Sequence, residues 1–161
     1  MKHDSQRELI ARAVIIHEGA LLVNWSRNQK TGENYCALPG GHVDPGESCV
    51  EALKREFQEE LDADLDVRDL CFVSESIYAG RKAKDKTRHE LVLYFHATPA
   101  RALPEEAGTI HSPEQTKHFR WLPLADLCDA NLLPPAIKEF LLRPDTTDPA
   151  PRYVFHDATR R

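Results

Sequence analysis

Three glutamates in one short stretch of the chain, Glu56, Glu59 and Glu60, have the spacing of a metal site. In a helix, positions i, i+3 and i+4 lie on one face, where like charges repel by roughly 0.2–0.5 kcal/mol per pair. A purely structural helix gains nothing from this repulsion. A helix that binds a hard divalent cation does, because Mg²⁺ prefers carboxylate oxygens and is usually bound together with a phosphate substrate. The spacing therefore predicts a magnesium site for a phosphorylated ligand.

The element that carries these glutamates is expected to be a half-buried amphipathic helix. Ser48 followed by Glu51 is the capping-box pattern that marks the start of a helix. Four apolar residues at helical spacing form one stripe: Val50, Leu53, Phe57 and Leu61. Because the glutamates flank this stripe, the helix can press its apolar face into a core and still present carboxylates beside it.

The rest of the chain alternates between strand and helix patterns. Strands are expected over 9–16, 20–23, 35–38, 70–79, 90–98 and 119–122, and a second amphipathic helix over 134–142. The segments 9–16 and 20–23 are expected to form a hairpin, and 35–38 is expected to end at Pro39-Gly40-Gly41. Interleaved strands and helices predict an α/β protein with a mixed sheet.

Composition limits the classes of function. A chain of 161 residues suffices for one domain, and its net charge of −5 argues against a protein that mainly binds nucleic acid or an anionic membrane. An anionic substrate must therefore be met locally, by metal ions and a few placed cations. The N-terminus has no apolar signal region and no stretch is long enough to span a membrane, so we expect a cytoplasmic protein with no membrane partner.

The stretch from Gly41 to Ala63 resembles the signature of the Nudix hydrolases. Its fixed positions are Gly41, then Glu47 after five residues, then Arg55-Glu56-Phe57-Gln58-Glu59-Glu60 after seven more. The flanking strands and Trp121-Leu122-Pro123-Leu124 also resemble the family. One departure lies at the end of the signature, where Asp62 and Ala63 replace a glycine and a large aliphatic residue. Asp tolerates the left-handed conformation that such a glycine adopts, so we expect the helix to end here nonetheless.

The resemblance implies an α/β/α sandwich around a mixed sheet. It implies one Nudix hydrolase domain over residues 1–143, followed by an extended C-terminal tail over residues 144–161. Within this tail, Tyr153-Val154-Phe155 is an apolar segment that we expect to dock on the body of the protein or on a second subunit. A homodimer is therefore kept as a hypothesis.

The resemblance also implies a reaction, the hydrolysis of a nucleoside diphosphate linked to a moiety X, with Mg²⁺ or Mn²⁺ as cofactor. The implied metal ligands are the carboxylates of Glu56, Glu59 and Glu60 and the carbonyl oxygen of Gly40. Arg55 matches a residue that pairs with neighbouring glutamates, whereas Gly41 and Glu47 match positions that support the geometry of the loop and helix. We favour Glu59 as the general base, with Glu56 as its rival.

Many relatives add an acidic metal ligand from outside the signature. Glu114, in the loop before the strand of Trp121, is the first candidate here, and Glu90 is the second. His42 lies beside the loop expected to face phosphate and is a further candidate donor. For each of these residues the alternative is an ordinary surface position without a role in the site, which is the more common case for such residues.

Cations in two polar loops are candidates for substrate binding. These are Arg27 in the loop 26–34, and Arg81, Lys82 and Arg88 in the basic run 81–88. The basic run is expected to be a loop between strands that holds phosphates or the backbone of RNA, and a solvated loop is the alternative. Four aromatic residues are candidates for stacking on a base: Trp25, Tyr35, Tyr78 and Phe119.

The sequence thus predicts a Mg²⁺-dependent pyrophosphohydrolase that acts on a small soluble nucleotide, such as a nucleoside triphosphate or a nucleotide sugar. Alternative substrates are oxidised nucleoside triphosphates, ADP-ribose, dinucleoside polyphosphates and the 5′ end of RNA. A domain that senses a nucleotide without cleaving it is a further alternative. Such domains typically lose signature glutamates, and this chain keeps all of them.

Overall fold

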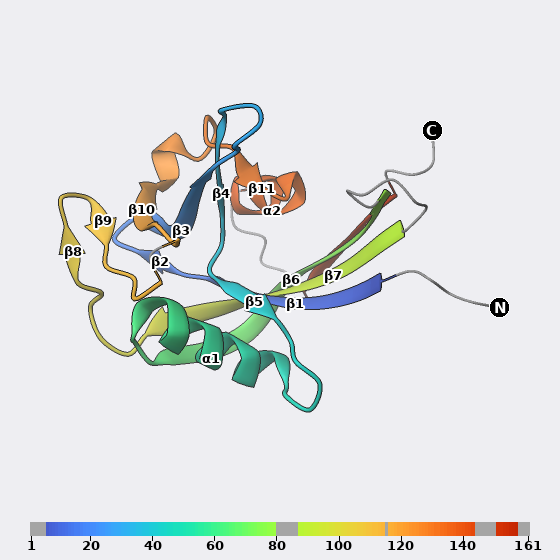
Figure 1. The fold of residues 1–161 in the computed structure, drawn as a ribbon, viewed down its shortest axis with the longest axis horizontal. Coiled ribbons are helices and arrows are strands. Elements are labelled where there is room, and N and C mark those ends of the chain that lie inside the picture. The colour runs from blue at the N-terminus through green and yellow to red at the C-terminus, as the bar shows by residue number, and fades with distance from the viewer. Residues whose placement is uncertain (1–5, 80–86, 115, 144–150, 158–161) are drawn as a thin grey trace.

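The computed structural model describes residues 6–79, 87–114, 116–143 and 151–157, which form two β-sheets and two α-helices (Figure 1). The first half of the chain contains β1 (Gln6–Val14), β2 (Ile16–His17), β3 (Ala20–Arg27), β4 (Asn34–Ala37), β5 (Gly40–His42), α1 (Cys49–Leu61) and β6 (Leu65–Ala79). The second half contains β7 (Thr87–Pro99), β8 (Glu105–Glu106), β9 (Thr109–Ile110), β10 (Phe119–Pro123), the 3₁₀ turn η1 (Leu124–Asp126), β11 (Leu132–Leu133), α2 (Pro135–Leu141) and β12 (Arg152–Asp157).

Both sheets are mixed, which confirms the predicted α/β class. The first sheet has the order β12-β6-β7-β1-β5, in which β1 pairs parallel with β7 and antiparallel with β5. The second has the order β11-β4-β3-β10-β9-β8, with β2 paired to β3. Because β4 of the second sheet leads within three residues to β5 of the first, the Gly40–Gly41 segment lies where the two sheets meet.

The two helices cover opposite faces of β1. Ala11 and Ala13 of this strand pack in the cluster that contains Leu53 and Phe57 of α1. The alternate residues of β1, among them Ile10, pack in a second cluster that contains α2. Since successive side chains of a strand point to opposite faces, this pattern produces the α/β/α layering that the resemblance implies. No helix in the described part of the chain is long and apolar enough to cross a membrane.

Helix α1 forms as the sequence predicts. The Ser48 hydroxyl accepts a hydrogen bond from the Glu51 amide, and the Glu51 carboxylate accepts one from the Ser48 amide, so the capping box is complete. Leu53, Phe57 and Leu61 are buried. The helix ends at Asp62, whose φ of 48° and ψ of 44° are left-handed, and the Gln58 side chain donates to its carboxylate at 2.8 Å. A local hydrogen bond thus supports the residue that replaces the usual glycine.

Replacing Ser48 with Ala is expected to lower the free energy of unfolding by about 1 kcal/mol, because the mutation leaves a helix-terminal amide without its partner. Urea denaturation of the wild type and the variant measures this difference. Ser48→Asn is the matched control, since Asn caps a helix as well as Ser does. Equal stabilities for the wild type and Ser48→Ala would show that the capping hydrogen bond does not contribute to stability.

Three expectations need correction. The predicted hairpin is shorter than expected, because β1 belongs to the first sheet and only Ile16–His17 pairs with the start of β3. The Gly40–Gly41 segment does not end the strand pattern, since it forms β5. Strands β6 and β7 extend beyond their apolar parts, so Arg88 lies in a strand and not in a loop.

The predicted tail contains a strand. Tyr153, Val154 and Phe155 belong to β12, which pairs parallel with β6 and so docks on the body of the protein. The Tyr153 hydroxyl donates a hydrogen bond to Glu75 of β6. Figure 1 shows β12 at the edge of the first sheet, on the far side from β5.

Candidate active site

The three glutamates of α1 differ sharply in their exposure to solvent. The side chain of Glu60 is 1% exposed, that of Glu56 is 18% exposed and that of Glu59 is 53% exposed. The gradient follows from the apolar stripe, because Glu60 lies beside Leu61 and Phe57 on the buried side of the helix. The site thus contains one buried carboxylate, one half-buried carboxylate and one carboxylate that is open to water.

The Gly40–Gly41 segment passes directly over these carboxylates. A Cβ atom on Gly41 would overlap the carboxyl group of Glu56, so only glycine leaves this carboxylate where it is. Gly40 has a φ of +120°, and a Cβ atom there would overlap the backbone carbonyl of Ala11. Gly40 and Gly41 are therefore both required to be glycine. The backbone at Gly40 lies too close to strand β1 for a side chain, and the backbone at Gly41 lies too close to the Glu56 carboxylate.

Arg55 holds the loop and the glutamates together. Its Nε and Nη2 atoms donate to the two carboxylate oxygens of Glu47, at 3.1 and 2.7 Å. Its Nη1 atom donates to Glu56 at 2.9 Å and to Glu59 at 3.4 Å. The hydrogen bond from Arg55 lowers the pKa of Glu47, so this carboxylate stays ionised in the fold. Two charge-assisted hydrogen bonds in a fork geometry fix the loop before α1 to the middle of the helix.

Glu60 is contacted from a segment far along the chain. Lys117 Nζ donates to Glu60 Oε1 at 2.8 Å, and the Ser112 hydroxyl donates to the Glu60 backbone carbonyl at 2.6 Å. Burial raises the pKa of Glu60, and the contact with Lys117 partly opposes this. The second carboxylate oxygen, Oε2, is buried and has no hydrogen-bond partner among the described residues. A buried oxygen without a partner is costly, so Glu60 is a carboxylate with one coordination position to fill.

Glu114 lies in the same segment as Ser112 and Lys117. Its amide donates to the Ser112 hydroxyl at 3.2 Å, and its carbonyl accepts from the Lys117 amide at 3.0 Å. Glu114, the first candidate for an additional metal ligand, therefore lies in the segment whose Ser112 and Lys117 contact Glu60. Glu90, the second candidate, lies on β7, where it accepts a hydrogen bond from the Tyr78 hydroxyl.

The donor set suits a hard divalent cation, although the side chains do not surround one point. In the part of the chain that the structure describes, no three His, Cys, Asp or Glu side chains are grouped closely enough to hold a metal ion. Like-charged carboxylates separate unless a cation lies between them, and here Arg55 contacts two of the three and Lys117 contacts the third. The carboxylate oxygens, together with the unpartnered Oε2 of Glu60, are nevertheless the ligands that Mg²⁺ prefers.

The carbonyl oxygen of Gly40, which the resemblance implies as a metal ligand, accepts a hydrogen bond from Arg12. Arg12 Nη1 lies 2.5 Å from this oxygen and 3.0 Å from the carbonyl oxygen of Leu38. The sequence reasoning missed both Arg12 and Lys117. No local pattern marks either residue, because each contact depends on strand pairing or loop packing between distant parts of the chain.

The structure describes two of the four candidate substrate-binding cations, Arg27 and Arg88, and these two have different surroundings. Arg27 lines a cavity of about 750 Å³ at the end of the β3–β4 hairpin, together with Tyr35, and its Nε donates to the Gly32 carbonyl at 3.0 Å. Arg88 Nη2 lies 2.6 and 2.5 Å from the two carboxylate oxygens of Glu8, so its charge is already matched within the first sheet. Arg81 and Lys82 lie outside the described residues.

The ion pair of Glu8 with Arg88 leads to a prediction on pH. The Arg88 hydrogen bond lowers the pKa of Glu8, so the stability that this carboxylate contributes is present above its unfolded pKa and is lost as the pH falls through its folded pKa. Glu8→Gln should therefore reduce the free energy of unfolding by about 1 kcal/mol at neutral pH and by much less in acid. Urea denaturation at both pH values measures this, with the exposed Glu33→Gln as control. A difference that does not change with pH would contradict the prediction.

The four aromatic candidates for base stacking differ in accessibility. Phe119 is fully buried, so its proposed stacking role is wrong. The guanidinium of Arg120 covers the ring of Trp25, with Cζ 3.1 Å from the ring centroid. The guanidinium of Arg88 lies over the ring of Tyr78, with Cζ 5.6 Å from the ring centroid. Tyr35 lines the cavity that also contains Arg27, which makes this residue the most suitably placed of the four.

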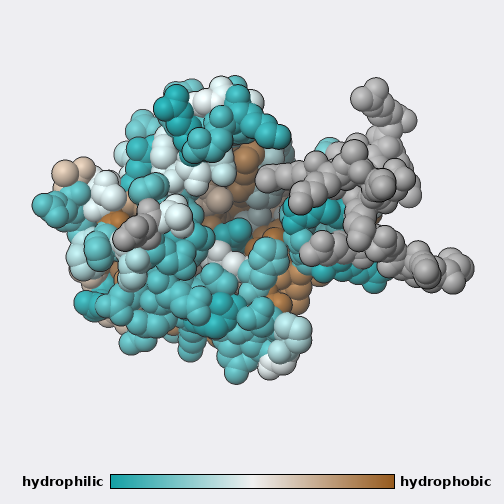
Figure 2. Space-filling model, viewed as in Figure 1, coloured by the Kyte–Doolittle hydropathy of each residue, from teal (hydrophilic) through white to brown (hydrophobic). Residues whose placement is uncertain are grey.

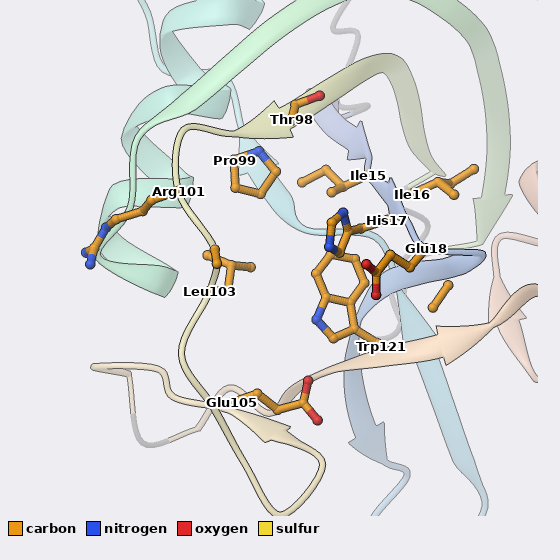
Figure 3. A pocket seen from close by; sticks show the side chains of 12 residues that line it. Ile15, Ile16, His17, Glu18, Thr98, Pro99, Arg101, Leu103, Glu105 and Trp121 are labelled. Atoms are coloured by element: carbon orange, nitrogen blue, oxygen red, sulfur yellow. The ribbon is translucent and has the colours of Figure 1, made fainter.

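A second cavity, of about 540 Å³, lies apart from the glutamates (Figure 3). Its wall includes Ile15, Leu103 and Trp121, and none of the three glutamates of α1 lines it. In Figure 3 the carboxylates of Glu18 and Glu105 lie near Trp121, whereas the guanidinium of Arg101 points away from the cavity, toward α1. The carboxylates of Glu18 and Glu105 would repel a phosphate, and Arg101 points away from the cavity. We therefore assign the candidate active site to the three glutamates of α1 and not to this cavity.

Comparison with known proteins agrees with this geometry. A family model described as NUDIX domain matches residues 7–143, whereas no curated protein matches the chain. Among solved structures, the chain is similar to a NUDIX hydrolase from Nitrosomonas europaea, with a TM-score of 0.61, 20% identity, and coverage of 83% of this chain and 85% of that one. It is also similar to the E. coli ORF135 protein, with a TM-score of 0.56, 22% identity, and coverage of 88% and 90%.

A third similar structure is an ADP-ribose pyrophosphatase from Streptococcus suis, with a TM-score of 0.53, 16% identity, and coverage of 93% of this chain and 98% of that one. At these identities the structural likenesses show the fold, while the family model covers most of the chain. The chain belongs to the NUDIX domain family and is a hydrolase that acts on pyrophosphate bonds.

Proposed function

We propose that this protein is a Mg²⁺-dependent pyrophosphohydrolase of a small soluble nucleotide, with Mn²⁺ able to replace Mg²⁺. One observation carries the proposal: Glu60 is buried with an unpartnered carboxylate oxygen, one helical turn after Glu56, whose own carboxyl group lies against Gly41, where a side chain has no room. Lys117 pairs with Oε1 of this carboxylate, whereas the buried Oε2 is unfavourable unless a ligand such as a cation binds it. The ligands proposed for the metal are Glu56, Glu59, Glu60, the carbonyl oxygen of Gly40, and Glu114.

The proposed roles of the glutamates follow from their exposure to solvent and their contacts with Arg55. When bound, the metal supplies positive charge against the phosphate oxygens and acidifies water. Glu59 is the proposed general base, because it is the most exposed of the three glutamates and its only ion pair among the described residues, with Arg55, is at 3.4 Å. Glu59 takes a proton from the attacking water as the water oxygen forms a bond to one phosphorus atom. The bond from that phosphorus to the bridging oxygen breaks, and the bridging oxygen leaves with the other phosphoryl group, so that the products are a nucleotide and a phosphorylated X. Glu56, held by Arg55 at 2.9 Å, is less free to accept a proton.

The Nudix family acts on small nucleotides, and X remains to be identified for this chain. Figure 2 shows the surface hollowed between the lobe that carries α2 and the edge formed by α1 and β5, with hydrophobic side chains in its wall. We propose that Arg27 and Tyr35 contact the more distant part of the substrate, and that Arg81 and Lys82 contribute further cations. Arg88 is a weaker candidate because of its pairing with Glu8.

A hydrolysis panel tests the proposal. The wild-type protein is incubated with Mg²⁺, with Mn²⁺ or with a chelator, and the products are identified by mass spectrometry. The panel contains nucleoside triphosphates, oxidised nucleoside triphosphates, nucleotide sugars, ADP-ribose, NADH, dinucleoside polyphosphates and triphosphorylated RNA. Metal-dependent cleavage of one small nucleotide class supports the proposal and names X.

The other outcomes of the panel are equally decisive. Cleavage confined to triphosphorylated RNA would replace the proposal with 5′-end processing of RNA. Tight binding of a nucleotide without any cleavage, by a protein that is folded by circular dichroism, would replace it with a nucleotide sensor. Gel filtration of the same sample, with and without the nucleotide, tests the predicted homodimer.

A further inference from the structure

The contact between Lys117 and Glu60 has a consequence for metal binding. Lys117 Nζ lies 2.8 Å from Oε1 of a carboxylate that is 1% exposed, whereas the Lys117 side chain itself is 31% exposed. Among the described residues, Lys117 is the only cationic side chain in an ion pair with Glu60. The ammonium therefore reaches from the surface to the most buried of the three carboxylates.

The position of Lys117 is fixed by the segment that carries it. The Ser112 hydroxyl donates to the Glu60 carbonyl at 2.6 Å, and the Lys117 amide donates to the Glu114 carbonyl at 3.0 Å. At the other end of this segment, Phe119 is fully buried in β10. Both ends are anchored on the body of the protein, so the ammonium is held near Glu60 by the fold and not by the ion pair alone.

The hydrogen bonds of the Arg55 side chain to carboxylates go to glutamates other than Glu60. Two of its three nitrogen atoms donate to Glu47 and the third donates to Glu56 and Glu59. Arg55 thus stabilises the outer carboxylates and the loop, whereas Lys117 acts on the inner carboxylate. The two cations can be tested separately by mutation.

We infer that Lys117 competes with the divalent cation for Glu60, so that this ammonium group sets how tightly the site binds the metal. A dication on Oε2 of Glu60 would lie within a few ångströms of the ammonium on Oε1, where like charges in a partly buried site repel strongly. A dication on Oε1 would have to displace the ammonium. In either arrangement the positive charge of Lys117 opposes the binding of the metal. The inference rests on the proposed function, because it assigns Glu60 to the metal site.

Isothermal titration with Mn²⁺, without substrate and at mildly alkaline pH, tests the inference. Lys117→Met keeps the length and the apolar part of the side chain and removes its charge, so it should bind Mn²⁺ about tenfold more tightly than the wild type, or tighter still. Lys117→Arg keeps the charge and should bind Mn²⁺ no more tightly than the wild type does. Lys54→Met removes the same charge from the exposed side of α1 and should leave the Mn²⁺ affinity close to that of the wild type.

Thermal denaturation with and without Mn²⁺ gives a second readout, which applies also if Lys117→Met is less stable. The Mn²⁺-induced rise in Tm should be larger for Lys117→Met than for the wild type or Lys117→Arg. Unchanged or weaker Mn²⁺ binding by a folded Lys117→Met would overturn the inference and leave the proposed function standing. No Mn²⁺ binding by the wild type or by any variant would overturn the proposed function and the inference together.

Discussion

Replacing Glu60 with Gln is expected to reduce turnover by about three orders of magnitude or more, because a bound metal contributes several kcal/mol to such a reaction. Gln keeps the shape of the side chain but loses the negative charge that Mg²⁺ requires. The variant should also lose Mn²⁺ binding in a titration without substrate. The measurements are turnover on the substrate that the hydrolysis panel identifies and calorimetry with Mn²⁺.

The fold should survive this substitution. Burial raises the pKa of Glu60 because it disfavours the charged form of the carboxylate, and Gln avoids burying a charge there. Lys117 loses its partner but is exposed enough to be solvated. Glu51→Gln is the matched control, because it makes the same change on the same helix and Gln satisfies the capping box as well. A folded Glu60→Gln protein with turnover close to that of the control would refute the assignment of Glu60.

The parts of the site that could be predicted from sequence are those encoded locally. Helix α1, its Ser48 cap, its apolar stripe and its end at Asp62 depend on residues within one or a few turns of each other. The structure confirms the helix, the cap and the end, and it buries Leu53, Phe57 and Leu61 of the stripe, while Val50 is only partly buried. The contacts of Arg55 with Glu47 and Glu59 also join nearby residues. Local spacing therefore sufficed to place the three carboxylates on one helix, whereas the pairing of Arg55 with neighbouring glutamates was implied by the resemblance to the Nudix signature.

The contacts that could not be predicted join distant residues. Lys117 meets Glu60 across 57 positions of the sequence, and Glu8 meets Arg88 across 80. The second contact exists because β1 pairs parallel with β7 in a register that sets Gln6 opposite Arg88. Parallel pairing of this kind depends on the whole fold, and no turn in the local sequence reveals it.

Charge patterns caused the remaining errors. The run 81–88 reads as a loop because it is rich in Lys and Arg, yet Thr87 and Arg88 begin β7. The strand expected over 70–79 begins earlier, because Leu65–Ala79 is one strand in which Leu65 is buried between the exposed Asp64 and Asp66. An alternation of period two is a strand signal even when its polar members are aspartates.

Replacing Gly41 with Ala is expected to reduce turnover by roughly a hundredfold, the loss typical of displacing a group that orients a metal ligand. A Cβ atom on Gly41 would overlap the carboxyl group of Glu56, which is the free end of a flexible side chain. The carboxylate can therefore move away at little cost to the fold, but it then leaves the position in which it faces the metal. Turnover and Mn²⁺ affinity should both fall, while the Tm stays close to that of the wild type.

Gly40→Ala separates this effect from a general loss of structure. A Cβ atom on Gly40 would overlap the Ala11 backbone carbonyl, which cannot move without disturbing β1, and its φ of +120° is strained for any residue other than glycine. Gly40→Ala should therefore lower the Tm markedly, in contrast to Gly41→Ala. The expected outcomes at the two neighbouring glycines therefore differ: Gly40→Ala loses stability, whereas Gly41→Ala loses activity. Full turnover by Gly41→Ala, with unchanged Mn²⁺ affinity, would show that Glu56 does not need its present position for the reaction.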